Sequence, residues 1–230
     1  MLQLPKVIGH RGAAAYSPEN TLDSFREARR RGAAWVETDI KLTADGVPIV
    51  MHDESLKRTT GVDRLVARTP RAELPAGVPT FEEAIACFGE EGLGCNVEIK
   101  PCPGREAETG RVVVETLRRC WPAHLPDPLL SSFKDESLAA ARATAPEFAR
   151  SLLIGKFVED WRARVAAVEA IGINTNGERL TAPWTCAIKD AGLVLGVYTI
   201  DDPKVARALV GMGVDVVITD APDVILAAIG

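Results

Sequence analysis

The chain has 230 residues, of which 47% are hydrophobic, and it carries a formal net charge of −5 at pH 7. This size and composition favour a folded protein with a large core, and the acidic balance argues against a nucleic-acid-binding protein, which normally presents a basic face. No apolar run approaches the roughly 18 residues of a membrane span, and the first residues lack the layout of a signal peptide. We therefore expect a cytoplasmic protein with no stable membrane association, in which the five scattered cysteines are reduced thiols.

Short apolar runs typical of β-strands alternate with helical patterns along the whole chain. Strands are predicted at residues 6–9, 34–39, 95–99, 129–132, 150–154, 171–175, 193–198 and 215–218. Helices are predicted at residues 20–31, 105–120, 135–145, 159–170, 183–191 and 203–211. A further helix start is indicated by the Thr-x-x-Glu capping box that begins at Thr80.

The number of these units bears on the fold class. Eight β/α units in a chain of this length predict an α/β fold, a TIM (β/α)8 barrel formed by a single domain over residues 1–230. The alternative is a doubly wound open sheet, which would place a glycine-rich dinucleotide-binding turn after the first strand. The residues found there, His10-Arg11-Gly12-Ala13, do not form that motif, so the barrel is favoured.

A hairpin interrupts the second unit of the predicted barrel. Asp45-Gly46 is a turn signal, and residues 47–51 have the pattern of a returning strand. The polar segment at about 54–79 follows, and we expect it to be structureless. The prediction is therefore a barrel with a small insertion after the second strand, at about residues 45–79.

Carboxylates gather at the ends of two predicted strands. Glu37 and Asp39 are two residues apart on one strand, so their side chains project to the same side. Two carboxylates this close repel each other unless a cation joins them, and Glu98 on the next barrel strand is a candidate third ligand. An all-oxygen site favours one hard divalent cation, Mg²⁺ or Ca²⁺. The alternative is a rim of ion pairs, for instance Glu37 with Arg11 or Glu98 with Lys100.

Two histidines and two cations follow strands at the same predicted end of the barrel. His10 and His52 can together supply a general base and a general acid near neutral pH. Arg11 can hold a phosphate or carboxylate with two parallel hydrogen bonds, and Lys100 adds a point charge. With a metal ion, this set of groups suits phosphoryl-transfer chemistry on a small substrate.

At this point the chain closely resembles the glycerophosphodiester phosphodiesterase family. The resemblance extends over essentially the whole chain, and it is carried by ordered motifs that include His10-Arg11-Gly12, Pro18-Glu19-Asn20-Thr21, Glu37-Thr38-Asp39, Thr43-Ala44-Asp45-Gly46, His52-Asp53, Glu98-Ile99-Lys100-Pro101, Ser131-Ser132-Phe133 and Ile218-Thr219-Asp220. It implies a TIM barrel with a small inserted segment. It also implies hydrolysis of glycerophosphodiesters, such as glycerophosphocholine and glycerophosphoethanolamine, to an alcohol and sn-glycerol 3-phosphate with a divalent cation.

The resemblance also implies roles for individual residues. These are metal ligands (Glu37, Asp39, Glu98), an acid/base pair (His10, His52), phosphate contacts (Arg11, Lys100), walls of the substrate pocket (Phe133, Tyr198) and a residue that orients the first loop (Asn20). Tyr198 stands where many members of the family have tryptophan, which alters the expected shape of the pocket rather than the chemistry. Cys102, which follows the Glu98 motif, is expected near the mouth of the barrel.

Two other functions remain open from the sequence. A lysophospholipase-D-like phosphodiesterase would need an apolar groove or a membrane-facing surface, for which the sequence gives no signal. A non-catalytic binding barrel would be expected to lack at least one of the histidines or carboxylates named above, and all of them are present. Because the insertion is short, we expect an open site that tolerates several alcohol groups.

Overall fold

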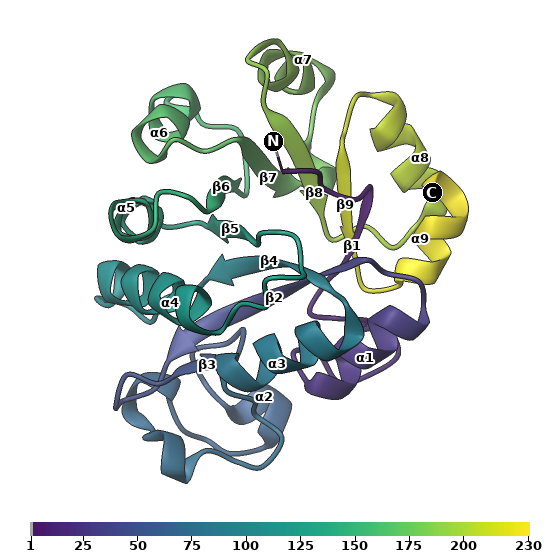
Figure 1. The fold of residues 1–230 in the computed structure, drawn as a ribbon. Coiled ribbons are helices and arrows are strands. Elements are labelled where there is room, and N and C mark those ends of the chain that lie inside the picture. The colour runs from purple at the N-terminus through teal and green to yellow at the C-terminus, as the bar shows by residue number, and fades with distance from the viewer. Residues whose placement is uncertain (1) are drawn as a thin grey trace.

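The computed structural model describes residues 2–230, and its centre is a closed barrel of parallel strands (Figure 1). The barrel strands are β1 (Val7–Gly9), β2 (Trp35–Leu42), β4 (Gly94–Ile99), β5 (Leu129–Ser132), β6 (Ala149–Ile154), β7 (Gly172–Asn176), β8 (Val194–Tyr198) and β9 (Val216–Thr219). Each strand pairs with the next one around the ring, and β1 pairs with both β2 and β9, which closes the sheet. The predicted TIM barrel is confirmed.

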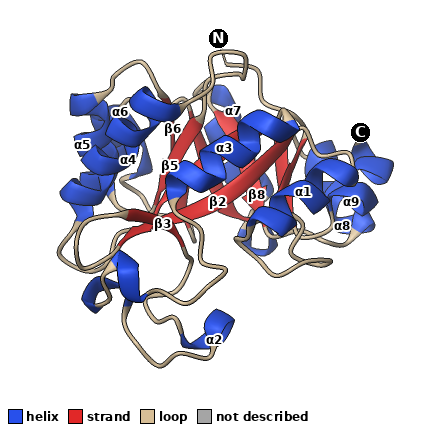
Figure 2. Ribbon diagram, turned by 60° about the horizontal axis from the view of Figure 1, so that its bottom comes forward, coloured by secondary structure: helices blue, strands red, loops and turns tan. Residues whose placement is uncertain are grey.

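Helices cover the outside of this barrel (Figure 2). They are α1 (Leu22–Arg30), α3 (Phe81–Glu91), α4 (Glu106–Cys120), α5 (Asp135–Thr144), α6 (Trp161–Val168), α7 (Ala182–Asp190), α8 (Pro203–Gly211) and α9 (Pro222–Ile229). The capping box predicted at Thr80 is present, because the Thr80 hydroxyl accepts from the Glu83 amide while the Glu83 carboxylate accepts from the Thr80 amide. The predicted helices and strands therefore match the observed ones to within a few residues.

The main difference lies at the second barrel strand and the segment after it. Strand β2 runs three residues further than predicted, because the antiparallel strand β3 (Pro48–Val50) pairs with its second half. The expectation that residues 54–79 are structureless is wrong. They contain a short helix α2 (Lys57–Thr60) and two turns of 3-10 helix, Val66–Arg68 and Arg71–Glu73. Figure 2 shows this part of the chain beyond β3, away from the helices around the barrel.

A small apolar cluster explains why this segment is ordered. Leu56, Val66 and Val78 are buried against Ile49 and Met51 of the hairpin. Their irregular spacing carries no helical or strand period, so the sequence pattern did not reveal them. Cys102 is buried in the same cluster, so its thiol is not exposed at the mouth of the barrel.

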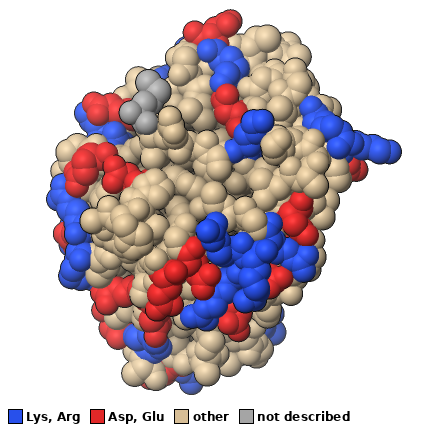
Figure 3. Space-filling view, turned by 45° about the vertical axis from the view of Figure 1, so that its right-hand side comes forward, with Lys and Arg blue, Asp and Glu red and all other residues tan. Residues whose placement is uncertain are grey.

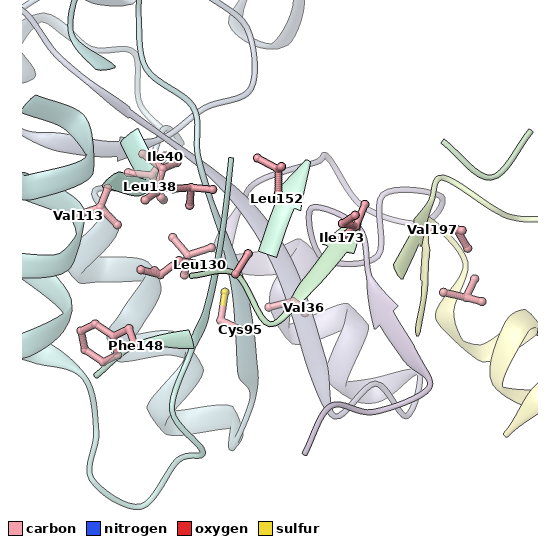
Figure 4. Close-up of a cluster of buried hydrophobic side chains, with 14 of the residues drawn as sticks. Val36, Ile40, Cys95, Val113, Leu130, Leu138, Phe148, Leu152, Ile173 and Val197 are labelled. Atoms are coloured by element: carbon pink, nitrogen blue, oxygen red, sulfur yellow. The ribbon is translucent and has the colours of Figure 1, made fainter. Parts of the chain in front are cut away.

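The barrel strands alternate between two apolar environments. Side chains on their outer face, such as Leu130 of β5, pack against helical residues that include Val113 of α4 and Leu138 of α5 (Figure 4). A separate cluster of inward-facing residues fills the barrel at one end, and it includes Trp35 and Ile218. Further along the same inner face, towards the carboxyl ends of the strands, the side chains become polar and charged, which places the site described below.

Charges of both signs lie side by side on the face of the molecule that Figure 3 shows. At the carboxyl end of α1, Arg30 and the capping residue Arg31 both pair with Glu27. Exposed ion pairs of this kind contribute little to stability, and they break up a surface into small patches of either sign. Within residues 2–230, no helix combines the length and the apolar character that crossing a membrane requires.

Candidate active site

A cavity of about 150 Å³ opens at the carboxyl ends of the barrel strands. Its lining includes the predicted site residues His10, Arg11, Glu37, His52, Glu98, Lys100, Phe133 and Tyr198. In TIM-barrel enzymes this end of the barrel carries the active site, since the loops that follow the strands converge there. The structure thus brings together residues that are spread over most of the sequence.

The loop after β1 makes a sharp turn that presents His10 and Arg11 to the cavity. Gly12 has a φ of 94°, and a side chain at this position would collide with Ser24, whose Oγ lies 2.3 Å from the place of a Cβ atom. Arg11 itself has a φ of 50°, a conformation that residues other than glycine seldom adopt. The turn aims the Arg11 backbone amide at Glu37, and the two are 3.0 Å apart.

Three buried carboxylates form a compact cluster beside this loop. Asp39 of β2 is the register partner of Glu98 of β4, and Glu37 lies two residues earlier on the same face of β2. Each of the three offers an oxygen atom that lies within 4.8 Å of those of the other two. The spacing of the residues along two paired strands therefore brings together the three carboxylates that were predicted as ligands.

The electrostatics of this cluster favour a bound cation. Burial raises the pKa of Glu37 to about 8, and the neighbouring Asp39 carboxylate adds to the shift. Burial and Asp39 likewise raise the pKa of Glu98 to about 7. A divalent cation would stabilise the charged form of all three groups, and all-oxygen ligands suit a hard ion. The residues present therefore fit a divalent cation.

Arg11 and Lys100 lie against the same carboxylates. The Lys100 Nζ donates to Glu98 at 2.9 Å and to Asp39 at 3.1 Å, and the Arg11 Nε lies 3.3 Å from Asp39. Burial would raise the pKa of Asp39, but Lys100 and Arg11 outweigh it and lower that pKa to about 2. Ion pairs and a carboxylate cluster that could hold a metal ion thus occur together at this site, although the sequence presented them as alternatives.

Asn20 holds one of these carboxylates in place. Its side-chain amide donates to Asp39 at 2.8 Å, and its side-chain oxygen accepts from the Thr38 hydroxyl at 2.9 Å. Asn20 is buried and has a φ of 57°. It therefore links the first loop to β2, which is more than the orientation of the loop that the family resemblance implied.

His10 has a carboxylate partner from the last strand of the barrel. Its Nδ1 lies 2.6 Å from Oδ1 of Asp220, which follows β9. Burial alone would lower the pKa of His10, but the hydrogen bond to Asp220 and the charge of Glu37 outweigh it, so the pKa is raised above its ordinary value. The pairing favours the protonated imidazolium form of His10.

His52 follows β3 and has a different partner. Its Nδ1 lies 2.6 Å from Oδ1 of Asp53. The Asp53 carboxylate is shared with Arg58, whose Nε donates to it at 2.6 Å, and Arg58 also makes a two-pronged contact with Glu19. Burial lowers the pKa of His52, Lys100 acts in the same direction, and together they outweigh the nearby carboxylates.

Phe133 and Tyr198 are aromatic residues of the cavity lining. Their rings meet edge to face, with centroids 6.1 Å apart, and Phe133 is 41% exposed at the mouth. The structure thus places both predicted pocket walls on the cavity. The sequence analysis predicted no role for Asp220, Arg58 or Glu19, although Asp220 and Glu19 stand in motifs that carried the family resemblance.

Comparison with known proteins agrees with this geometry. The glycerophosphoryl diester phosphodiesterase family profile matches residues 10–224. A phosphodiesterase of Oleispira antarctica, solved in complex with the product sn-glycerol-3-phosphate, is 37% identical, with a TM-score of 0.95 over 98% of this chain and 97% of that chain. The glycerophosphodiester phosphodiesterase of Thermotoga maritima is 26% identical, with a TM-score of 0.80 over 98% of each chain. A glycerophosphodiester phosphodiesterase of Caldanaerobacter subterraneus is 29% identical over 239 residues, which cover 96% of each chain. Since the profile spans nearly the whole sequence, this chain belongs to the glycerophosphoryl diester phosphodiesterase family and is an enzyme of that kind.

Proposed function

We propose that this enzyme hydrolyses glycerophosphodiesters to an alcohol and sn-glycerol 3-phosphate with the help of one divalent cation. The observation that carries the proposal is the arrangement of His10 and His52, each oriented by its own carboxylate, around one cavity that also contains three buried acidic side chains. The relative from Oleispira antarctica was solved with sn-glycerol-3-phosphate, which supports the same product here.

We propose that Glu37, Asp39 and Glu98 hold the cation. When bound, Mg²⁺ or Ca²⁺ would act as a Lewis acid on a phosphoryl oxygen and offset its negative charge. The raised pKa values of Glu37 and Glu98 support this assignment, because a cation removes the cost of burying several charges together. Arg11 and Lys100 already lie against these carboxylates, so they can bind the remaining phosphate oxygens with charge-assisted hydrogen bonds.

The two histidines differ in a way that supports separate roles. Asp220 stabilises a positive charge on His10, so His10 can donate a proton to the leaving alkoxide. Burial and the nearby Lys100 lower the pKa of His52, which favours its neutral form and leaves it able to accept a proton from the attacking hydroxyl group. We therefore propose His10 as the general acid and His52 as the general base.

A second candidate function has one specific observation in its favour. A groove of about 400 Å³ adjoins the cavity, and it shares Phe133 and Leu153 with it. Ile154 and Val158 continue its apolar lining, and three basic residues also line it (Lys156, Arg164 and Arg179). An apolar groove beside the reactive groups could take an acyl chain, as a lysophospholipase-D-like activity would need.

Product analysis distinguishes these functions. We would incubate the purified protein and Mg²⁺ with glycerophosphocholine, glycerophosphoethanolamine or lysophosphatidylcholine, and identify the products by phosphorus NMR. We expect sn-glycerol 3-phosphate from the first two substrates, released at least about a hundredfold more slowly by a His10→Ala preparation purified in the same way. Release of phosphocholine would contradict the proposed bond cleavage. Lysophosphatidic acid as the main product would favour the second function, and no cleavage of any diester would favour a binding protein.

We further propose that the enzyme works in the cytoplasm on small-molecule substrates. All five cysteines are free, and Cys87, Cys95 and Cys102 are buried. Unpaired cysteines are typical of proteins from a reducing compartment. Fractionation of the native cells with an antibody would test this location.

A further inference from the structure

Three surface hollows share lining residues with the catalytic cavity, and they differ in charge. The lining of the first includes Glu19 and Arg58, which pair with each other. The second is lined by three carboxylates and three lysines, so its charges are balanced as well. The third is the groove of about 400 Å³ whose lining includes Lys156, Arg164 and Arg179, and we call it the basic groove.

The basic groove carries charge of one sign. Within the described part of the chain, its lining contains three cations and no carboxylate, and the remaining residues are apolar or glycine. The chain as a whole has a net charge of −5, so this surface runs against the overall balance. A concave surface lined by cations concentrates anions, because the potentials of the side chains add.

Two of the three cations are available to a ligand. Arg164 is already paired, because its Nε and Nη2 donate to Asp135 at 2.8 and 2.7 Å. Lys156 and Arg179 are exposed, and neither side chain forms an ion pair or a hydrogen bond within residues 2–230. A bound anion could therefore contact both without breaking an existing interaction.

The basic groove lies at the same end of the barrel as the catalytic groups. Phe133 directly follows β5, Lys156 lies in the loop after β6, and Arg179 ends the 3-10 turn that follows β7 (Figure 1). All three therefore stand at the carboxyl ends of neighbouring strands. Burial raises the pKa of Tyr198, and the charge of Arg179 partly offsets that rise, so Arg179 acts on a wall of the catalytic cavity.

The basic groove is also continuous with the catalytic cavity, because Phe133 and Leu153 line both. The cavity measures about 150 Å³, which is less than the roughly 300–1,000 Å³ of common ligand sites. It is therefore small for a whole glycerophosphodiester. One of the two groups esterified to the reacting phosphate must extend beyond it, and the basic groove is a path that passes Phe133.

The chemistry of the lining favours an anionic group over an acyl chain. An acyl chain would take water away from the Lys156 and Arg179 head groups without supplying a hydrogen-bond acceptor. A phosphate group supplies several acceptors and a negative charge, so it would form charge-assisted hydrogen bonds with both. The apolar residues Leu153 and Ile154 would then contact the carbon atoms of the alcohol that carries this phosphate.

We propose that Lys156 and Arg179 of the basic groove bind a second phosphate group on the alcohol side of the substrate, so that the enzyme prefers diesters whose alcohol is itself phosphorylated. The inference rests on the proposed function, because it names a substrate class for the same cavity. Neither residue lines the catalytic cavity, so both act on substrate binding, and their effect should appear mainly in KM.

Two diesters that share the same reacting end test this proposal. Glycerophosphoglycerol has a neutral alcohol, whereas bis(glycerophospho)glycerol carries a second phosphodiester on that alcohol. The second compound also has two equivalent ends, which alone doubles its kcat/KM. Beyond this doubling, we expect the wild-type protein with Mg²⁺ at low salt to prefer it by roughly threefold to tenfold. The added preference should largely disappear at about 500 mM NaCl, because exposed charges are then screened.

Variants of the two cations identify the source of the preference. Lys156→Gln and Arg179→Gln should each reduce it by about twofold or more, and the double variant should lose nearly all of it. Turnover of glycerophosphoglycerol should stay near the wild-type value in all three variants. Both side chains are exposed and make no polar contact within residues 2–230, so the fold should not change.

Lys204→Gln is the matched control. Lys204 is an exposed cation in the first turn of α8, and α8 begins at the same end of the barrel. It does not line the basic groove. Its substitution changes the net charge by the same amount as either groove variant, and it should leave the preference between the two diesters intact.

Binding measurements separate the basic groove from the proposed reaction. Calorimetry in a His52→Ala background compares the two diesters while they stay largely intact. We expect tighter binding of bis(glycerophospho)glycerol, and loss of that difference when Lys156→Gln and Arg179→Gln are added. If neither diester is hydrolysed by the wild type but this pattern of binding is found, the proposed reaction fails and the basic groove is supported.

Three results would overturn the role of the basic groove even if both diesters are hydrolysed. One is no preference beyond the factor of two in the wild type. Another is a preference that survives in the double variant or is lost equally in Lys204→Gln. The third is binding to phosphatidylglycerol vesicles that the double variant loses, without any preference between the diesters, since the anion would then be a lipid surface.

Discussion

The catalytic cavity has two walls of different origin. The barrel wall carries His10, Glu37, Asp39 and Glu98, whose positions follow from the loop after β1 and from the register of β2 with β4. The insertion wall carries His52, which follows the short strand β3 and is held by Asp53 and the exposed Arg58. Paired strands hold side chains more rigidly than exposed ion pairs do. One histidine is therefore part of the rigid barrel, while the other depends on surface contacts.

Removal of either histidine should cause the largest loss of turnover. We expect His10→Ala and His52→Ala each to lower turnover of glycerophosphocholine by roughly 10²- to 10⁴-fold, because each loses one proton-transfer step. Both residues lie in loops after strands and not in the apolar core. The thermal midpoints of unfolding should therefore change little. Steady-state kinetics and circular dichroism melts check the two effects. A variant with wild-type turnover would remove that histidine from the mechanism.

Removal of the carboxylate that pairs with each histidine should change a different limb of the pH–rate profile. Asp220→Asn removes the group that raises the pKa of His10, so the alkaline limb of the rate profile should move to lower pH. Asp53→Asn removes a group that raises the pKa of His52, so the acidic limb should also move to lower pH. Turnover at the optimum should fall by about tenfold or more in each case. Histidine pKa values from NMR titration check the cause, and unchanged limbs in both variants would contradict the assigned roles.

The barrel wall should also make stability depend on pH when the cation is removed. Glu37 and Glu98 have pKa values of about 8 and about 7 in the folded chain, against an ordinary value of 4.5. Between the ordinary pKa of 4.5 and the folded-state pKa values, the folded state binds more protons than the unfolded state. These groups therefore stabilise the fold at low pH, and this stability is lost as the pH rises towards 8.

Thermal denaturation of the chelated protein measures this effect. We expect the midpoint to fall by roughly 5 °C or more between pH 5.5 and pH 8.5, and added Mg²⁺ or Ca²⁺ to restore most of it at the higher pH. Glu37→Gln is the matched control, because it removes one titrating group and should flatten the dependence. A midpoint that rises with pH in the chelated wild type would be the opposite of the expected sign.

The smallest expected effect concerns the contact that ties the insertion to the barrel. Arg58 bridges Asp53 to Glu19, and Glu19 in turn accepts from Arg11. Arg58→Gln should loosen His52 and lower turnover by about threefold to tenfold, with a larger loss at high salt. Arg64→Gln breaks a comparable exposed pair with Glu73 in the same insertion and should leave turnover unchanged. Equal losses in both variants would indicate a general effect on the insertion rather than a link to His52.

The sequence predicted the barrel wall better than the insertion wall. Apolar runs marked the strands, and reactive residues such as Glu37 and Glu98 stood at the ends of those runs, where parallel strands must converge. The insertion carries its buried residues at irregular intervals, so its short helices had no periodic signal. Because the structure of the insertion could not be predicted, its role in holding His52 could not be predicted either.

Contacts that form only when the barrel closes could not be predicted from the sequence pattern either. His10 and Asp220 are 210 residues apart and meet only because β1 pairs with β9. An aspartate after the last strand was a weak signal, since only the closed ring makes it a neighbour of the first loop.

The central claim is that the three carboxylates of the barrel wall hold a cation on which hydrolysis depends. The most direct test is release of sn-glycerol 3-phosphate from glycerophosphocholine after chelation, and again with Mg²⁺ or Ca²⁺ restored, in the wild type and in Glu98→Gln. We predict that chelation abolishes release, that one of these ions restores it in the wild type, and that Glu98→Gln needs at least about tenfold more of that ion. Full release in the presence of chelator, or the same ion requirement in Glu98→Gln, would contradict the account.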